Sequence, residues 1–129
     1  LRKSEKIAEH LVNNWYSAYL ISRQGNIKFY AVLQPTIYTS GSNYEYFSEK
    51  DKITVENMKS NFDAVYPIIK NKIELKCKYD QSFCDSFIDA TKFINKNDRL
   101  FLDECHLNKK GNEVIIKKLI SHINLIEFQ

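Results

Sequence analysis

The stretch NIKFYAVLQP, residues 26–35, decides the fold that this sequence predicts. It is short, rich in aromatic and β-branched side chains, and ended by Pro35, as a β-strand is expected to be. Residues 30–33 are apolar at every position instead of at alternate ones. A strand that is apolar on both faces is typical of a parallel sheet covered by helices on each side. The stretch therefore predicts an α/β fold.

Helical patterns flank this strand. The segment before it predicts a helix with an N-cap at Ser4 and a stop at Gly25. One stripe of this helix is apolar, with Ala8 and Val12 beside it, and comprises Ile7, Leu11, Trp15, Ala18 and Tyr19. After the strand, residues 36–52 predict a long polar loop with aromatic side chains. A second helix is predicted from an N-cap at Thr54, and Pro67 should kink or restart it.

The C-terminal half predicts one further strand and one further helix. The strand is expected within residues 75–78 or residues 83–88. The helix is expected to begin after an N-cap at Asn108. Its apolar face would be formed by Val114, Ile115, Leu119, Ile120 and Ile123. This order of elements is that of α/β layers, and no repeat or linker divides residues 1–129, so we expect a single domain.

The number of strands is too small for a finished sheet. One clear strand and one doubtful strand cannot form a parallel sheet that is covered on both faces, because a buried strand needs backbone partners on both sides. The first residue is Leu1 instead of Met. We therefore expect neighbouring strands to come from a missing N-terminal segment of the same polypeptide or from another subunit.

Charge and hydropathy exclude two classes of partner. The net charge of +3 comes from 19 basic and 16 acidic residues that are evenly interspersed, which argues against binding to nucleic acid. No apolar run approaches the ~20 residues that a membrane span requires. The sequence therefore predicts neither a nucleic-acid partner nor a membrane span.

Three cysteines are present. Cys77 and Cys84 would close a small loop in an exported protein, and the odd count leaves at least one free thiol. A zinc site would combine the three cysteines with His106, but the sequence lacks the C-x-x-C pairs that such sites use. Cys105 also directly precedes His106, which is awkward for one tetrahedral ion. We therefore expect no metal site.

A second stretch, RLFLDECHLNKKGNEVIIKKL at residues 99–119, contains the candidate catalytic residues. Asp103 and His106 lie three apart, just before the last predicted helix. An imidazole can take a proton from a hydroxyl nucleophile, and a carboxylate on its other nitrogen fixes the tautomer. Asn108 would cap the helix, and Gly111 would let it pack closely on a neighbouring segment.

Other candidates receive simpler interpretations. Ser40 and Ser42 follow the strand, but a nucleophile elbow requires a helix directly after the turn, and more than ten polar residues are expected to intervene. The side chain of Cys105 is expected to point away from those of its neighbours. Gln34 ends the strand where α/β sites open, so we expect it to contact substrate. Three tyrosines could line a substrate groove or simply pack the loop: Tyr38, Tyr44 and Tyr46.

The two stretches resemble the C-terminal part of the SGNH (GDSL-type) hydrolases. FLDECHLNKKGNEVIIKKL, residues 101–119, is similar to the terminal Asp-x-x-His segment and helix of that family, and FYAVLQP, residues 29–35, is similar to the strand that carries LQP in one branch. The resemblance implies an incomplete, flavodoxin-like three-layer fold. It also implies a serine esterase in which Asp103 and His106 belong to a Ser-His-Asp triad. The implied substrate is a carboxylic ester, a small molecule or an acyl group on carbohydrate, and no cofactor is implied.

The sequence departs from this family in lacking both the nucleophile motif and the segments that carry the oxyanion donors. It contains no Gly-Asp-Ser motif. The nucleophile and the oxyanion donors are therefore expected in the missing N-terminal segment, and this chain alone is expected to be inactive. The alternative is a non-enzymatic α/β module that binds a partner through an unpaired strand edge or through the aromatic loop.

Overall fold

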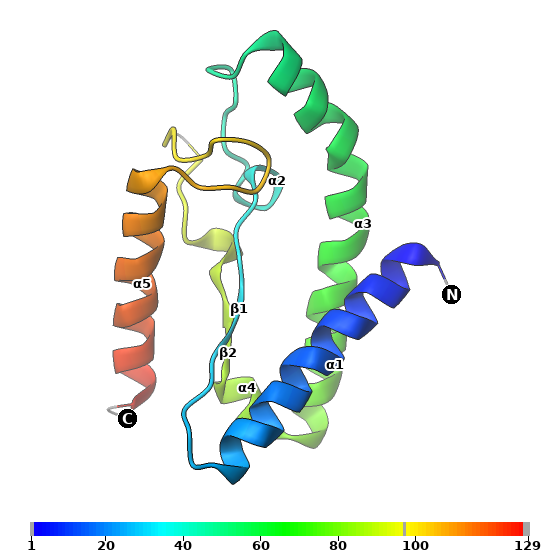
Figure 1. The fold of residues 1–129 in the computed structure, drawn as a ribbon, viewed down its shortest axis with the longest axis vertical. Coiled ribbons are helices and arrows are strands. Elements are labelled where there is room, and N and C mark those ends of the chain that lie inside the picture. Colours follow the sequence, from blue (N-terminus) through cyan, green and yellow to red (C-terminus); the bar gives the residue numbers. More distant parts are fainter. Residues whose placement is uncertain (1, 97, 128–129) are drawn as a thin grey trace. The chain divides into compact units, whose positions relative to one another are not determined.

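The computed structural model describes residues 2–96 and 98–127. The chain is mostly helical and carries one two-stranded parallel sheet (Figure 1). Its elements are α1 (Lys3–Gln24), β1 (Ala31–Leu33), α2 (Ile37–Ser40), α3 (Glu49–Tyr79), α4 (Gln81–Asp85), β2 (Phe87–Asp89), the 3₁₀ turn η1 (Ala90–Lys92) and α5 (Lys109–Glu127). No helix in these described ranges is long and apolar enough to cross a membrane.

The sheet lies where the sequence places it, but it is small. β1 keeps only the centre of the predicted strand, and Ala31 and Leu33 are buried. The N–H of Ala31 donates to the carbonyl of Ser86 at 2.8 Å, next to β2. β2 overlaps the second predicted segment, residues 83–88, whereas residues 75–78 belong to the end of α3. Within the described residues each strand therefore has one neighbour in the sheet.

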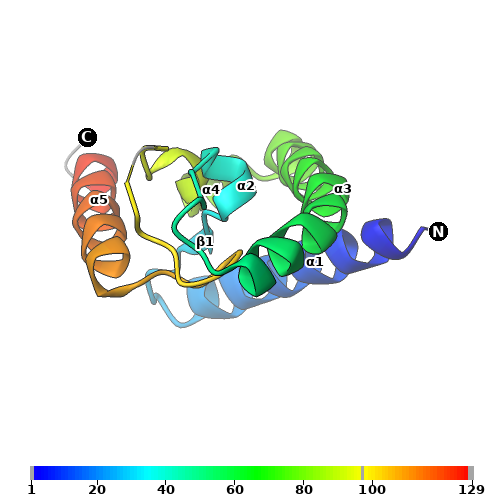
Figure 2. The same cartoon turned by 90° about the horizontal axis from the view of Figure 1, so that it is seen from above.

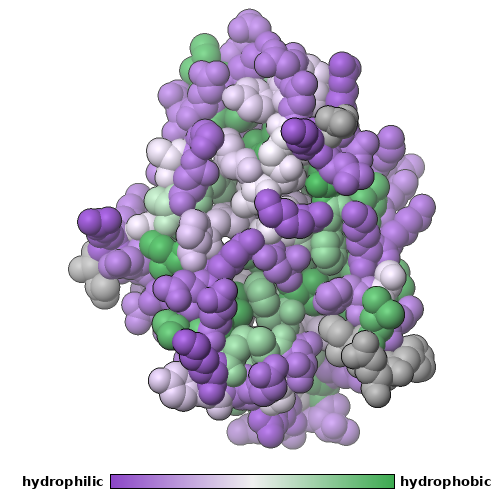
Figure 3. Space-filling model, turned by 180° about the vertical axis from the view of Figure 1, so that it is seen from behind, coloured by the Kyte–Doolittle hydropathy of each residue, from purple (hydrophilic) through white to green (hydrophobic). Residues whose placement is uncertain are grey.

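The chain divides into two compact units. The first comprises Leu1–Val32 and Ser60–Ile88, and the second comprises Leu33–Lys59 and Asp89–Gln129. The chain passes from one unit to the other within β1, within α3 and within β2. Polar and charged side chains cover most of the face drawn in Figure 3, with apolar side chains between them.

In the first unit, α1 lies beside the second half of α3 (Figures 1 and 2). The buried face of α1 is formed by Ala8, Val12 and Tyr19. It is turned toward the two residues beside the predicted stripe, and Ile7 of that stripe is 46% exposed. The helix begins two residues earlier than predicted, because its N-cap is Arg2, whose N–H donates to the carboxylate of Glu5 at 3.3 Å. Ser4 is therefore not the N-cap. The predicted stop at Gly25 is confirmed.

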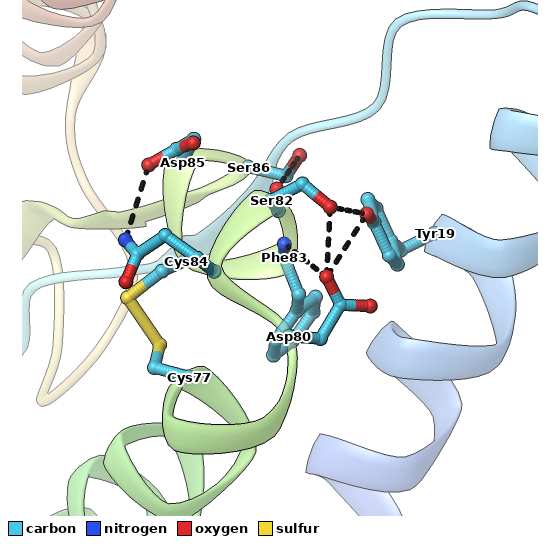
Figure 4. Close-up of a disulfide and its surroundings, with 9 residues drawn as sticks. Tyr19, Cys77, Asp80, Ser82, Phe83, Cys84, Asp85 and Ser86 are labelled. Atoms are coloured by element: carbon cyan, nitrogen blue, oxygen red, sulfur yellow. Dashed lines mark hydrogen bonds between the residues drawn. A yellow bond between two sulfur atoms is a disulfide. The ribbon is translucent and has the colours of Figure 1, made fainter.

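An aromatic cluster connects α1 to α4, and a disulfide connects the end of α3 to α4 (Figure 4). Phe83 is fully buried. The rings of Tyr16 and Tyr19 pack edge-on against it, with ring centroids 5.1 and 5.4 Å from that of Phe83. Cys77 and Cys84 form a disulfide, so the predicted small loop is present. This pairing removes both cysteines from any zinc site, and Cys105 is the one cysteine that stays free.

Asp80 is the N-cap of α4 and the centre of a polar network in the same unit. Its carboxylate accepts hydrogen bonds from the Ser82 hydroxyl at 2.7 Å, from the Phe83 N–H at 3.3 Å and from the Tyr16 hydroxyl at 3.2 Å. The hydroxyls of Tyr19 and Ser82 also bond to each other. The hydrogen bond from Ser82 is the largest influence on the pKa of Asp80, which falls below its usual value.

α3 differs from its prediction at its start and at its proline. It begins at Glu49, five residues before Thr54, and the hydroxyl of Ser48 accepts the N–H of Asp51 at 3.3 Å. Thr54 lies inside the helix and donates to the carbonyl of Lys50 at 3.2 Å. The helix continues through Pro67 without restarting. Proline has no backbone N–H, so the helix loses one hydrogen bond there, and the pyrrolidine ring is exposed to solvent.

The core of the second unit lies around the segment that precedes α5. Tyr38 donates its hydroxyl to the carbonyl of Val55 at 2.6 Å and so ties α2 to the first turns of α3. On α5, Ile115 is buried as predicted, whereas Ile120 is 55% exposed. The buried residues of this core are Ile37, Phe47, Val55, Ile94, Leu100, Phe101 and Ile115.

Gly111 lets α5 begin against the backbone of Leu100. A β-carbon at this position would lie 2.6 Å from the Leu100 carbonyl oxygen, which also accepts the Asn108 N–H at 2.8 Å. A Gly→Ala change gains about 1 kcal/mol from helix propensity. That gain is smaller than the overlap with fixed backbone, so we expect Gly111→Ala to destabilise the fold by about 1–3 kcal/mol in urea denaturation.

Gly25→Ala is the matched control, because a β-carbon there would meet neighbours at 3.4 Å or more. Its φ of −82° is also accessible to alanine. A Gly111→Ala variant as stable as the Gly25→Ala variant would contradict the close packing of α5 on Leu100.

Candidate active site

The Asp-x-x-His stretch forms a tight loop that is closed at its base. Phe101 and Leu107 form an antiparallel bridge, and the Leu102 N–H donates to the His106 carbonyl at 2.7 Å. The structure confirms Asn108 as the N-cap of α5, since its side-chain oxygen accepts the Gly111 N–H at 2.9 Å. The loop is therefore held by a backbone bridge on one side and by a capped helix on the other.

Two contacts from the segment after β1 hold this loop. The hydroxyl of Tyr46 donates to the Phe101 carbonyl at 2.9 Å and accepts the Phe101 N–H at 3.2 Å. The Ile37 N–H, in the first turn of α2, donates to the carbonyl of Glu104 at 3.0 Å. No local sequence pattern predicts this positioning role of Tyr46, because its partner lies 55 residues away.

The side chains of Asp103 and His106 converge. The carboxylate oxygen Oδ2 of Asp103 lies 2.7 Å from Nδ1 of His106. The other oxygen, Oδ1, accepts the N–H groups of Cys105 at 2.9 Å and of His106 at 2.7 Å. One oxygen thus fixes the carboxylate on the backbone while the other binds the imidazole. The imidazole side chain is 73% exposed, so Nε2 is the ring atom left to accept a proton.

The electrostatics of the pair favour its charged forms. Partial burial acts to raise the pKa of Asp103, but hydrogen bonds from the Cys105 and His106 N–H groups and from the imidazole outweigh it. The pKa of Asp103 is therefore lower than usual. The hydrogen bond to Asp103, followed by the negative charge of that residue, raises the pKa of His106 above its usual value. A carboxylate that stabilises an imidazolium in this way is what a general base requires.

We expect Asp103→Asn to lower the pKa of His106, because the substitution removes the two largest causes of its elevation. The imidazolium would then lose its proton at lower pH. NMR titration of the imidazole ring protons in the wild type and the variant measures this difference. Glu104→Gln is the control and should lower the pKa less, since Glu104 acts by charge alone. An equal effect of the two substitutions would contradict the Asp103–His106 bond.

Cys105 lies closer to the pair than predicted. Its Sγ is 3.7 Å from Nδ1 of His106, so the expectation that its side chain points away is wrong. The loop turns between residues 103 and 106 and so brings the consecutive side chains of Cys105 and His106 close together. Burial, followed by the charges of Asp103 and Glu104, raises the pKa of the Cys105 thiol to about 11. Such a thiol is a poor nucleophile at neutral pH.

The serines after β1 are engaged elsewhere. Ser40 is the last residue of α2, and its hydroxyl donates to the Thr36 carbonyl at 2.8 Å and contacts the Ser42 hydroxyl at 2.7 Å. The prediction of a long polar stretch before the next helix is wrong, because α2 begins at Ile37. The residue at the turn between β1 and α2 is Thr36, the N-cap of α2, and not a serine. Neither serine therefore stands at a nucleophile elbow.

The remaining predicted site residues lie in the same unit. Gln34 is exposed directly after β1, and its contact with substrate stays a prediction. The three loop tyrosines are half-buried and pack against the core of the second unit, which favours a packing role. They are Tyr38, Tyr44 and Tyr46.

No family model, no curated protein and no solved structure matches this chain.

Proposed function

We propose that this chain is the C-terminal part of an SGNH-type serine esterase and that it supplies two members of a Ser-His-Asp triad. The observation that supports the proposal is the 2.7 Å contact between Asp103 Oδ2 and His106 Nδ1 in a loop whose backbone is held from three sides. An exposed Nε2 on an oriented imidazole is the atom that a serine hydroxyl would approach.

The reaction follows from the roles of these groups. Nε2 of His106 takes the proton of the serine hydroxyl while the serine oxygen attacks the ester carbonyl. Asp103 stabilises the imidazolium through Nδ1. The imidazolium then gives the proton to the leaving alcohol, and an acyl-serine remains. Water attacks that acyl group by the same proton transfers and releases the acid. None of these reaction steps requires a cofactor.

The nucleophile and the oxyanion donors belong, in this proposal, to a segment outside the chain. The sequence has no Gly-Asp-Ser motif, and Ser40 and Ser42 bond within their own turn. The proposed complete fold is a flavodoxin-like three-layer domain to which this chain contributes β1, β2 and their helices. Further strands would pair with the edges that the described sheet leaves open.

The proposed substrate is a carboxylic ester, such as an acyl group on a carbohydrate. An exposed imidazole suits an ester carried on a bulky alcohol, because the reacting atoms need not enter a closed cavity. Gln34, exposed after β1, would contact this substrate from the carboxyl end of the strand.

A serine-directed fluorophosphonate tests the proposal on the natural polypeptide that contains this chain. We expect the polypeptide to be labelled, and we expect labelling to be lost in His106→Ala and retained in His10→Ala, because His10 lies on the exposed side of α1. A folded polypeptide that is not labelled, or that is labelled equally in the His106→Ala variant, would refute the esterase.

The open sheet edges favour one second candidate, a non-enzymatic module that binds a partner strand. In that case Asp103 and His106 would stabilise the loop only. A natural polypeptide without a Gly-Asp-Ser segment ahead of this chain would support the module over the esterase.

A further inference from the structure

The loop that holds Asp103 and His106 also gathers a third potential metal ligand. One carboxylate oxygen of Asp103, Sγ of Cys105 and a ring nitrogen of His106 all lie within 4.8 Å of one another. Within residues 2–96 and 98–127 this is the one group of three or more such side chains. Oxygen, sulfur and nitrogen donors together are typical of zinc-class ions.

The distances suit a tetrahedral ion. Zinc binds sulfur at about 2.3 Å and nitrogen at about 2.0–2.1 Å, which places two such ligands about 3.6 Å apart. Sγ of Cys105 and Nδ1 of His106 are 3.7 Å apart. The adjacency of the two residues in sequence is therefore no obstacle, since the loop turns both side chains to the same side.

The carboxylate can adjust to an ion without unfolding the loop. Oδ2 of Asp103 is 2.7 Å from Nδ1, closer than the ~3.3 Å expected for two ligands of one tetrahedral ion. Oδ1 is fixed by two backbone N–H groups, so a small rotation of the carboxylate separates Oδ2 from the ring. The carboxylates of Asp103 and Glu104 also make the surroundings of the thiol negative, which attracts a cation.

We propose that Asp103, Cys105 and His106 bind one divalent ion of the zinc class, with water in the fourth position, and that this ion disables the pair as a base. Binding replaces the thiol proton, which is released to solvent. At Nδ1 the ion displaces the imidazole proton to Nε2, so the nitrogen that accepted a proton becomes a donor. The ion binding stands by itself, whereas the loss of base function rests on the proposed esterase.

Cadmium titration of the full chain with its disulfide intact tests the site. Cys105 is the one free thiol, so a cadmium–thiolate absorption band reports on this residue alone. We expect one ion per monomeric chain, and we expect Cys105→Ser to abolish the band and weaken binding by at least about tenfold in calorimetry. Cys105→Ser keeps the backbone N–H that donates to Asp103 Oδ1 at 2.9 Å. The serine hydroxyl can also replace the thiol in its side-chain hydrogen bond to the Asp103 carboxylate, so we expect the Asp103–His106 bond to remain.

The histidines provide the second comparison. His106→Gln should weaken cadmium binding by at least about tenfold, whereas His10→Gln should leave it unchanged. In the wild type, ¹⁵N NMR should show the His106 ring proton on Nε2 after cadmium is added. Absence of the band, equal affinity in His106→Gln, or two chains per ion would overturn the site. None of these readouts uses esterase activity, so failure of the metal site and failure of the esterase are distinguishable.

Discussion

His106→Ala is expected to lower kcat/KM for ester hydrolysis by the natural polypeptide about 10⁴- to 10⁶-fold. In the proposed esterase the imidazole is the group that takes the serine proton, so the variant would keep only substrate binding and the oxyanion donors. The measurement is steady-state hydrolysis of a chromogenic acyl ester. Asp103→Asn should cost about 10⁴-fold, because an amide at Oδ2 favours the wrong tautomer.

Loss of structure would not explain such a result. The His106 side chain is 73% exposed, and the bonds that hold the loop run through the His106 N–H and carbonyl, which alanine keeps. Circular dichroism of the variant should match that of the wild type. His10→Ala is the control and should hydrolyse the ester at the normal rate. A His106→Ala variant within tenfold of the wild type would contradict the assignment of the general base.

Phe101→Ala is expected to destabilise the protein by about 3–5 kcal/mol, the largest structural effect that we predict. Phe101 is 1% exposed in the core of the second unit, and its removal leaves a cavity in that core. The neighbouring Leu102 is 64% exposed, so Leu102→Ala should change the stability by less than about 0.5 kcal/mol. Urea denaturation of the two variants measures the difference.

The comparison separates burial from position in sequence. Both residues precede Asp103 in the same apolar lead-in, and their side chains alternate between the core and solvent. Equal destabilisation by the two substitutions would show that Phe101 does not anchor the loop in the core.

Sequence patterns predicted those parts of the fold that depend on contacts between residues close together in the chain. Gly25 ends α1, Asn108 caps α5 and Gly111 permits the contact with Leu100, because each role depends on backbone groups a few residues away. The Asp103–His106 contact belongs to the same class, since it is made within one turn of the chain.

The errors arose where several residues can cap the same helix. Ser4 has a good capping side chain, yet α1 begins at Lys3, because the Glu5 carboxylate accepts the N–H of the N-cap Arg2. Thr54 was predicted to start α3, but Ser48 caps it first and Tyr38 secures its early turns through Val55. Tertiary packing overrides local propensity in this way.

The Tyr46 phenol has a consequence for engineering this protein. Its hydroxyl hydrogen-bonds both the carbonyl and the N–H of Phe101, as the backbone of a neighbouring strand would. Phe101 lies just before the loop that carries Asp103 and His106. A graft that exchanges residues 43–48 to alter specificity would also remove these two hydrogen bonds to Phe101. Such a graft must keep tyrosine at position 46, or supply another side chain that both donates and accepts, if His106 is to stay in place.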